Sequence, residues 1–377
     1  MKKILNYIVV LSIVLIIISC TNDSKDKHDS FVYPTTLKIE KLYEIDNGYR
    51  NGEGAFILLR DNRLAYIYTC FNNGVNDNSS SDICIIKSKD EDKKKWSTPE
   101  ILINNHGIEN IMSVSLLRLP DNSILIQYLE KNSCNDLKIV RRYSFNELET
   151  VSQPYYLDTH EGYNVVNNDR VLLYNNHIYT PISRHLCKDG NFTYAGIMEL
   201  SITDTDIKGY SEIINIDTND SSAIFQEPGI INLNRKGRML MWFRNSTNNM
   251  FISKSDNYGK SFSQPIQIGI KTVPYSPSSI KRYKEDLFLV YNKWDKNNKN
   301  NKRTPLILSI SKTELASLDY EYILEDDNNS EYMYTSMYKL NKDLFLAYMV
   351  QKGRKITNRI VKIKNMFGVS YVKKSEK

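Results

Sequence analysis

The sequence is short of the residues that bind metals and of the patterns that build helices. Histidine and cysteine each occur only five times in 377 residues, and neither recurs at the spacing of a metal site. We therefore predict no metal and no cofactor. Glycine (15) is sparse, tyrosine (26) is abundant, and no long amphipathic helical pattern stands out. This composition favours a mainly β protein.

The sequence also lacks a strong excess of either charge. The formal net charge is +6, and the lysine-rich runs "KDEDKKKW" and "DKNNKNNKR" are interrupted by acids and asparagines. Such runs are typical of solvated loops rather than of a nucleic-acid surface. We therefore expect no nucleic-acid partner, and with no sign of an oligomer we expect a monomer.

One long apolar run stands at the start of the chain. "MKK" precedes "ILNYIVVLSIVLIIIS", and Cys20 follows at once. This order predicts a lipoprotein signal peptide at 1–19, with lipid on Cys20 and a flexible polar tether over 20–30. The chain would then be exported and anchored to the membrane of the cell envelope, with an outer-membrane location expected on its periplasmic or surface face. A secretory peptide with an incidental cysteine, or an uncleaved anchor, are the alternatives.

Four further cysteines are Cys70, Cys84, Cys134 and Cys187. Export permits disulfides, but four cysteines allow three pairings, and the sequence does not choose among them.

A hairpin pattern recurs six times along the chain: an apolar run, a polar turn, and a second apolar run, as in "FILLRDNRLAYIYT" and "MYKLNKDLFLAYMV". Asx and Gly residues between apolar runs are hairpin signals. The turns are separated by 49 to 61 residues and are marked by Asn62, Asn122, Asn176, Gly237, Asp286 and Asp343.

A second motif recurs out of phase with the hairpins. "SDNYGKSF" resembles the Asp-box, a turn held by its own side chains, and degenerate copies begin at Ser88, Ser144 and Ser311, with an eroded copy expected near Ser201. Two hairpin signals per unit give four strands per unit. We therefore predict an all-β, six-bladed β-propeller with degenerate Asp-box repeats over 31–377. Either "LKIEKLYEI" or the terminal "RIVKIKNMFGVSYV" would close the last blade.

Because the units repeat, residues at the same distance from their hairpin markers should occupy equivalent positions in the fold. Counting back from each hairpin marker predicts six residues at one mouth of the central channel: Glu53, Ser113, Asn167, Glu227, Pro277 and Tyr334. The returning strands bring Lys131, either Arg184 or His185, and Arg244 to this face, and loops bring Asp77, Asp136 and Arg303. The result is a concave face with acids, cations, amides and a tyrosine, as expected of a binding site.

Several stretches resemble the sialidase superfamily of Asp-box propellers, in particular its exported bacterial BNR-repeat branch. They include "NGEGAFILLRD", "IMSVSLLRLPD", "GYNVVNNDRV", "FQEPGI", "KRTPL" and "YTSM", and the resemblance covers nearly all of the mature chain. It implies a retaining exo-glycosidase with a tyrosine nucleophile.

The resemblance implies a role for each matching residue. "YTSM" makes Tyr334 the nucleophile, and "QEPGI" makes Glu227 the base that takes its proton. Asp77 matches the acid, with Asp82 as a rival. Arg244 and Arg303 match two of three arginines that bind the substrate carboxylate. In this interpretation Arg244 holds the substrate and is not a direct partner of Glu227. This last expectation follows only from the roles that the resemblance implies.

The first arginine of the family pattern has no counterpart at the matching place, where Glu53 stands in "NGEGAF". A carboxylate there would repel an acidic substrate unless a cation pairs with it. Candidate replacement cations on the same rim are Arg170, Lys131 and Arg282. Asn168 and His185 complete the candidate substrate-binding residues.

Three functions remain open. The first is an exo-α-sialidase-like hydrolase that releases a terminal sialic acid or related acidic sugar from glycans. The second is a uronate lyase with His185 or Tyr334 as the base. The third is a lipid-anchored glycan-binding propeller without turnover.

Overall fold

The computed structural model describes residues 31–188, 191–193, 196–206, 211–218, 223–298 and 300–369. Every regular element within these ranges is a β-strand, and none of the described residues forms a helix able to span a membrane. The predicted signal peptide, Cys20 and the tether lie outside the described residues.

The chain divides into two compact units. In the smaller unit, β1 (Phe31–Val32) pairs antiparallel with β29 (Gly368–Val369). The larger unit spans Thr35–Met366 and contains the sheets described below.

Three sheets of the larger unit are four-stranded antiparallel meanders, each built from consecutive strands. The first contains β3 (Asn51–Leu58), β4 (Leu64–Phe71), β5 (Ser81–Lys87) and β6 (Glu100–Ile103). The second contains β18 (Phe225–Asn232), β19 (Met239–Asn245), β20 (Asn249–Ser255) and β21 (Ile266–Lys271). The third contains β22 (Ser279–Tyr283), β23 (Asp286–Asn292), β24 (Leu306–Ser311) and β25 (Tyr320–Glu325).

A fourth sheet joins the two ends of the larger unit. It contains β26 (Glu331–Leu340), β27 (Asp343–Lys352), β28 (Lys355–Ile363) and, as its outer strand, β2 (Ile39–Ile45). Of the two segments considered for closing the last sheet, "LKIEKLYEI" supplies this outer strand, and the later one contributes part of β28.

The remaining strands form one nine-stranded sheet. Its first part holds β7 (Asn110–Arg118), β8 (Ile124–Ser133), β9 (Asp136–Ser144) and β10 (Tyr155–Tyr156). Its second part holds β11 (Tyr163–Val165), β12 (Leu172–Tyr174), β13 (His177–His185), β16 (Ile197–Asp204) and β17 (Ser211–Ile216). The two parts join where β11 pairs with β9 at one position. A short separate pair consists of β14 (Cys187–Lys188) and β15 (Asn191–Phe192).

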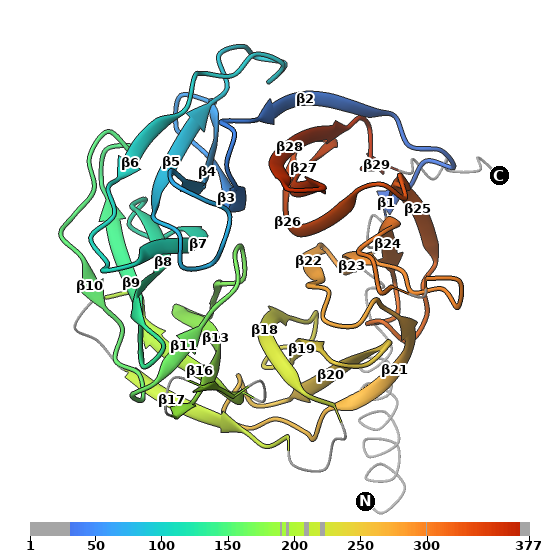
Figure 1. The fold of residues 1–377 in the computed structure, drawn as a ribbon. Helices are drawn as coiled ribbons and strands as arrows, with labels where there is room; N and C mark the ends of the chain where they lie inside the picture. Colours follow the sequence, from blue (N-terminus) through green and yellow to red (C-terminus); the bar gives the residue numbers. More distant parts are fainter. Residues whose placement is uncertain are drawn as a thin grey trace, which may run out of the picture. The chain divides into compact units, whose positions relative to one another are not determined.

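The sheets of the larger unit are arranged around a central axis, with β3, β7, β18, β22 and β26 innermost (Figure 1). Apolar side chains fill the space between neighbouring sheets, and one such cluster combines residues of β3 to β9. Four-stranded sheets packed face to face around an axis fit a β-propeller.

Three of the four predicted Asp-box turns share one pattern of hydrogen bonds, whereas in the turn that begins at Ser88 the serine hydroxyl accepts from the Leu64 amide instead. The Ser255 Oγ accepts from the Gly259 amide at 3.0 Å, and the Asn257 Oδ1 accepts from the Ser261 amide at 3.0 Å. The same spacing recurs in the turns that begin at Ser144 and Ser311. These side chains hold the turns, which is a structural role.

Ser201 does not begin such a turn, because it lies inside β16, which ends only at Asp204. The eroded copy expected near Ser201 would follow this strand, where residues 207–210 lie outside the described residues, so that expectation stays a prediction.

Candidate functional site

Four of the innermost strands carry the same irregularity. In β3, β7, β18 and β26 the pairing register shifts, and the first unpaired residue has a positive φ: 54° at Glu53, 64° at Ser113, 40° at Glu227 and 56° at Tyr334. A bulge of this kind redirects a side chain. The left-handed region costs a non-glycine residue about 1–2 kcal/mol, and such strain concentrates at functional sites.

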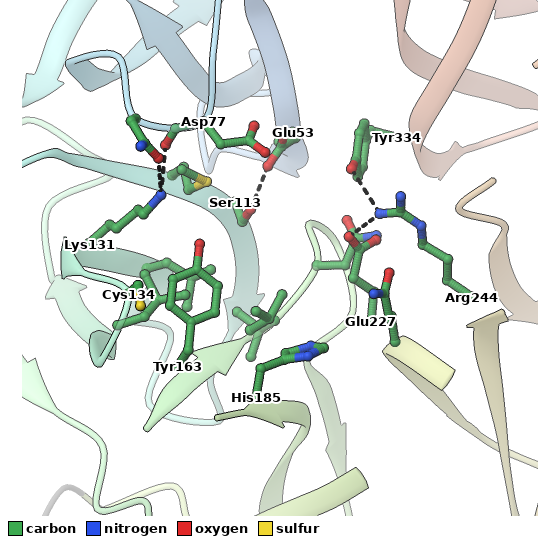
Figure 2. Close-up of a pocket in the computed structure, with 18 of the residues that line it drawn as sticks. Glu53, Asp77, Ser113, Lys131, Cys134, Tyr163, His185, Glu227, Arg244 and Tyr334 are labelled. Carbon is green, nitrogen blue, oxygen red and sulfur yellow. Dashed lines mark hydrogen bonds and ion pairs between the residues drawn. The ribbon is translucent and has the colours of Figure 1, made fainter. Parts of the chain in front are cut away.

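These redirected side chains line one pocket of about 410 Å³ (Figure 2), a volume typical of small-molecule sites. Five of the six predicted ring residues line it, whereas Pro277 lies before β22 and does not. The pocket is lined by Arg50, Glu53, Asp77, Asn78, Met112, Ser113, Leu129, Lys131, Cys134, Leu137, Tyr163, Val165, Val166, Asn167, His185, Gln226, Glu227, Arg244 and Tyr334.

The predicted nucleophile and base meet at a shared arginine. The Arg244 Nη1 donates a hydrogen bond to the Glu227 Oε1 and lies 3.4 Å from the Tyr334 phenol oxygen. The second carboxylate oxygen of Glu227 accepts from the Asn167 amide at 2.8 Å. The expectation that Arg244 would not pair directly with Glu227 is therefore wrong, because their strands place the two charges side by side.

This environment keeps the phenol protonated. Burial, followed by the negative charge of Glu227, raises the pKa of Tyr334 to about 12, above the ordinary value of about 10. For Arg244, burial opposes the charged form, but the Glu227 carboxylate outweighs it and raises the guanidinium pKa. A phenol with so high a pKa needs a base to become a nucleophile near neutral pH.

Arg50 is a functional candidate that sequence reasoning missed. Its side chain is only 10% exposed and pairs with the carboxylates of Glu53 and Asp77, and its guanidinium lies 4.8 Å from the centre of the Phe71 ring. The other Glu53 oxygen accepts from the Ser113 hydroxyl. The cation needed beside Glu53 is thus supplied three residues earlier in the same chain.

Asp77 lies at the open side of the pocket, with its side chain 70% exposed. Desolvation acts to raise the pKa of this carboxyl, but the charge of Arg50 prevails and holds the pKa below its ordinary value. Its rival, Asp82, accepts from the Asn105 amide at 2.7 Å and is not among the pocket residues.

Lys131 and a disulfide form the neighbouring wall. The Lys131 Nζ lies 5.6 Å from the centre of the Tyr163 ring and donates to the Asn78 side chain. Cys134, which lines the pocket, is bonded to Cys187. The other disulfide joins two residues of the first sheet, Cys70 and Cys84, so the pairing left open by the sequence is now assigned.

His185 lines the pocket with both ring nitrogens engaged. The Nε2 lies 2.7 Å from the Ser183 hydroxyl, and the Nδ1 lies 2.8 Å from the Thr193 carbonyl oxygen. Burial lowers the pKa of His185. A ring held in this way is poorly placed to abstract a proton from a substrate.

Arg170 and Asn168 lie beneath the pocket rather than in its wall. The Arg170 guanidinium donates to the main-chain carbonyl of Glu227 and to that of Ser278, the latter at 2.7 Å, and lies 5.4 Å from the centre of the Trp242 ring. Burial lowers the pKa of Arg170 to about 10, so it remains a cation at neutral pH. Asn168 is 2% exposed and donates to two main-chain carbonyls.

The two remaining arginines differ in position. Arg303 is close to the site, where its Nη2 donates to the Tyr275 carbonyl at 3.1 Å and its Nη1 lies 2.9 Å from the Met333 sulfur. Arg282 does not lie on this rim, which corrects the prediction: its Nη1 donates to Asn234 near the opposite hairpin ends. Arg282 is the fourth residue of β22 and pairs with Leu287 beside the hairpin turn, at the end of the strand away from the pocket.

A model of one protein family matches most of the chain. Residues 68–346 match the BNR repeat-like domain. A search of the curated proteins finds no match.

Solved structures share the fold at low sequence identity. A protein of unknown function from Dyadobacter fermentans has a TM-score of 0.68 at 16% identity, over 86% of this chain and 99% of that chain. The NanB sialidase from Streptococcus pneumoniae has a TM-score of 0.65 at 12% identity, over 86% of this chain and 70% of that chain. The intramolecular trans-sialidase from Ruminococcus gnavus has a TM-score of 0.66 at 12% identity, over 93% of this chain and 100% of that chain.

These likenesses identify an all-β, sialidase-like propeller fold, and the matched repeats identify the family. The chain belongs to the BNR repeat-like domain family.

Proposed function

We propose that the chain is a retaining exo-glycosidase that releases a terminal sialic acid or a related acidic sugar from glycans. The observation that carries the proposal is the contact of one guanidinium, Arg244, with both the Glu227 carboxylate and the Tyr334 phenol. Tyrosine nucleophiles of this kind occur in sialidases.

The proposed first step forms a bond between the Tyr334 oxygen and the anomeric carbon. Glu227 accepts the phenolic proton as the bond forms, because the Tyr334 pKa of about 12 leaves little phenolate at neutral pH. A neutral phenol suits a sugar that carries a carboxylate at its anomeric carbon, since an anionic nucleophile would be repelled. Water then attacks the anomeric carbon and breaks the glycosyl–tyrosine bond: Asp77, deprotonated in the first step, takes the water proton, and Glu227 returns its proton to the Tyr334 oxygen.

Recognition of the substrate carboxylate falls to Arg50 and Arg244, with Arg303 close by. Both pocket arginines already pair with carboxylates of the chain. The carboxylate of an acidic substrate would therefore have to replace a carboxylate of the protein at one of these arginines. Fork-shaped guanidinium groups suit this exchange, because each offers several donors in one plane.

This exchange also supplies the acid. When the substrate carboxylate engages Arg50, the exposed Asp77 loses the cation that holds its pKa low. The pKa of Asp77 then rises, and the carboxyl can carry the proton that the departing glycosidic oxygen needs.

The apolar part of the pocket lining supports a sugar with an apolar substituent. Met112, Leu129, Leu137, Val165 and Val166 line the pocket together with the charged groups. An acyl methyl group would bury against them favourably, at about 25 cal/mol per Å² of apolar surface.

We further propose that the ring has six blades, with the nine-stranded sheet divided at the single β11–β9 pairing. We retain the lipoprotein proposal for residues 1–19 and Cys20, and thus an envelope location. The two disulfides support it, because disulfides persist mainly in exported proteins.

The test is release of free sugar from fluorogenic α-sialosides and from related acidic and neutral glycosides. Wild type should cleave an acidic member of the set, and Tyr334→Phe and Glu227→Gln should each lose about a thousandfold in kcat/KM. Tyr338→Phe, on the same strand outside the pocket, is the matched control. Equal activity in all four proteins would exclude the tyrosine mechanism, and an unsaturated product absorbing in the ultraviolet would indicate a lyase instead.

A further inference from the structure

The loop between β11 and β12 extends toward the middle of the ring (Figure 1). Within this loop, residues Asn167–Arg170 have the sequence "NNDR", and Asn167, Asn168 and Arg170 are each less than 5% exposed. No apolar cluster of the core contains them, so their burial calls for polar partners.

Those partners are the bulges that form the pocket. A bulge leaves the carbonyl groups of its unpaired residues without a ladder partner, and a buried carbonyl without a donor is costly. Asn168 Nδ2 donates to the Gly54 carbonyl at 2.8 Å and lies 3.4 Å from the Tyr334 carbonyl oxygen. The Asp169 amide donates to the Val114 carbonyl at 3.0 Å.

Arg170 completes the set at the fourth bulge. Its guanidinium donates to the carbonyl of Glu227, the residue with the positive φ, and at 2.7 Å to that of Ser278 in the next sheet. One short segment therefore bonds to main-chain carbonyls of all four bulged strands, β3, β7, β18 and β26.

Asp169 fixes the strand of the nucleophile from a second side. Its Oδ2 accepts from the Ser336 hydroxyl and the Met337 amide, each at 3.1 Å. Its Oδ1 accepts from the Lys281 Nζ at 2.7 Å. Ser336 is where the pairing of β26 resumes after its bulge, so this carboxylate anchors the end of the strained turn.

We infer that Asn167–Arg170 is a positioning element that holds the strained bulges of Glu53, Glu227 and Tyr334 in their working geometry. The inference rests on the proposed function for its catalytic consequence, whereas its structural part stands on the contacts alone. Without the segment's donors, each bulge can relax toward regular pairing, and its side chain would leave the pocket. None of Asn168, Asp169 and Arg170 lines the pocket, so they act through the residues that do.

The experiment compares the full-length wild type with Asn168→Ala and Arg170→Met. Arg142→Met is the matched control, because Arg142 also donates to a main-chain carbonyl, that of Ser152 at 2.8 Å, but lies outside the pocket. Two quantities are measured: amide hydrogen exchange in β18 and β26, and kcat and KM on the acidic glycoside that wild type cleaves best.

We expect exchange in these two strands to accelerate at least tenfold in both variants and not in the control. We expect kcat to fall about a hundredfold, the effect of displacing a reacting group by about 1 Å, with KM changed less than about threefold. Unchanged exchange and unchanged kcat would overturn the inference. Unfolding of the milder variant, Asn168→Ala, would overturn it too, since a positioning role requires a folded ring without that amide.

The readouts separate this inference from the proposed function. If wild type cleaves none of the glycosides but exchange accelerates in both variants, the positioning element stands and the hydrolase proposal fails. If wild type is active and Tyr334→Phe is not, while both segment variants match wild type in exchange and kcat, the hydrolase stands and the positioning element fails.

Discussion

Arg244 lies between Glu227 and Tyr334, donating to the carboxylate and standing 3.4 Å from the phenol oxygen. The three groups form a chain in which the cation stabilises the carboxylate and a negative charge that develops on the phenol. The phenol is not ionised in advance, because its pKa is raised to about 12.

Removing the Glu53 carboxylate from the pocket should improve the binding of acidic ligands. In Glu53→Gln, Arg50 keeps Asp77 but loses one of its two competing carboxylates, so we expect KM for an acidic glycoside to fall severalfold. The free energy of unfolding should fall by about 1–3 kcal/mol, because a buried charged hydrogen bond is lost.

Steady-state kinetics and denaturant unfolding of Glu53→Gln measure both effects. Arg63→Gln, which removes an exposed pair with Asp61, is the control and should change neither quantity appreciably. A rise in KM in Glu53→Gln would mean that the carboxylate itself binds the substrate.

The raised pKa of Tyr334 predicts a pH effect on stability. A folded-state pKa of about 12 against about 10 in the unfolded chain favours the folded state fully below pH 10. This contribution is lost as pH rises from 10 toward 12, because the unfolded phenol releases its proton first. Relative to Tyr334→Phe, wild type should therefore lose about 1 kcal/mol between pH 9 and pH 11. Parallel curves for the two proteins would show that the phenol titrates normally.

The Cys134–Cys187 disulfide should stabilise the rim of the pocket. The bond closes a loop with a sequence separation of 53, for which the chain-entropy model gives about 4 kcal/mol. The double variant Cys134→Ser/Cys187→Ser should therefore unfold at a lower denaturant concentration and show a higher KM. The corresponding pair Cys70→Ser/Cys84→Ser, within one sheet and with a separation of 14, should lose less stability and leave KM unchanged.

Much of this site could be predicted because repeats fix position. Hairpin markers at regular intervals located Glu53, Ser113, Glu227 and Tyr334 on one ring, and the bulges now explain why these residues point inward. The same arithmetic failed for Pro277, since β22 begins two residues later and shows no register shift against β23.

What could not be predicted depends on contacts between distant segments. Arg50 was missed because the family pattern has its first arginine where Glu53 stands, and only the fold shows that the Arg50 guanidinium pairs with both Glu53 and Asp77. Arg282 was misplaced because it lies beside the hairpin turn between β22 and β23 and not at the pocket end of the strand. The role of Asn168 and Arg170 beneath the pocket required knowledge of which carbonyls the bulges leave unpaired.

The most direct test of the central claim is to trap the glycosyl–enzyme bond. A sialosyl fluoride that carries a second fluorine next to the anomeric carbon should react with wild type, because the fluorine slows hydrolysis of the intermediate more than fluoride departure. We predict that intact-protein mass spectrometry will show one added sugar, that the peptide containing Tyr334 will carry it, and that Tyr334→Phe will not be labelled. Labelling of Glu53, Asp77 or Glu227, or no labelling of a wild-type protein that cleaves sialosides, would contradict the account.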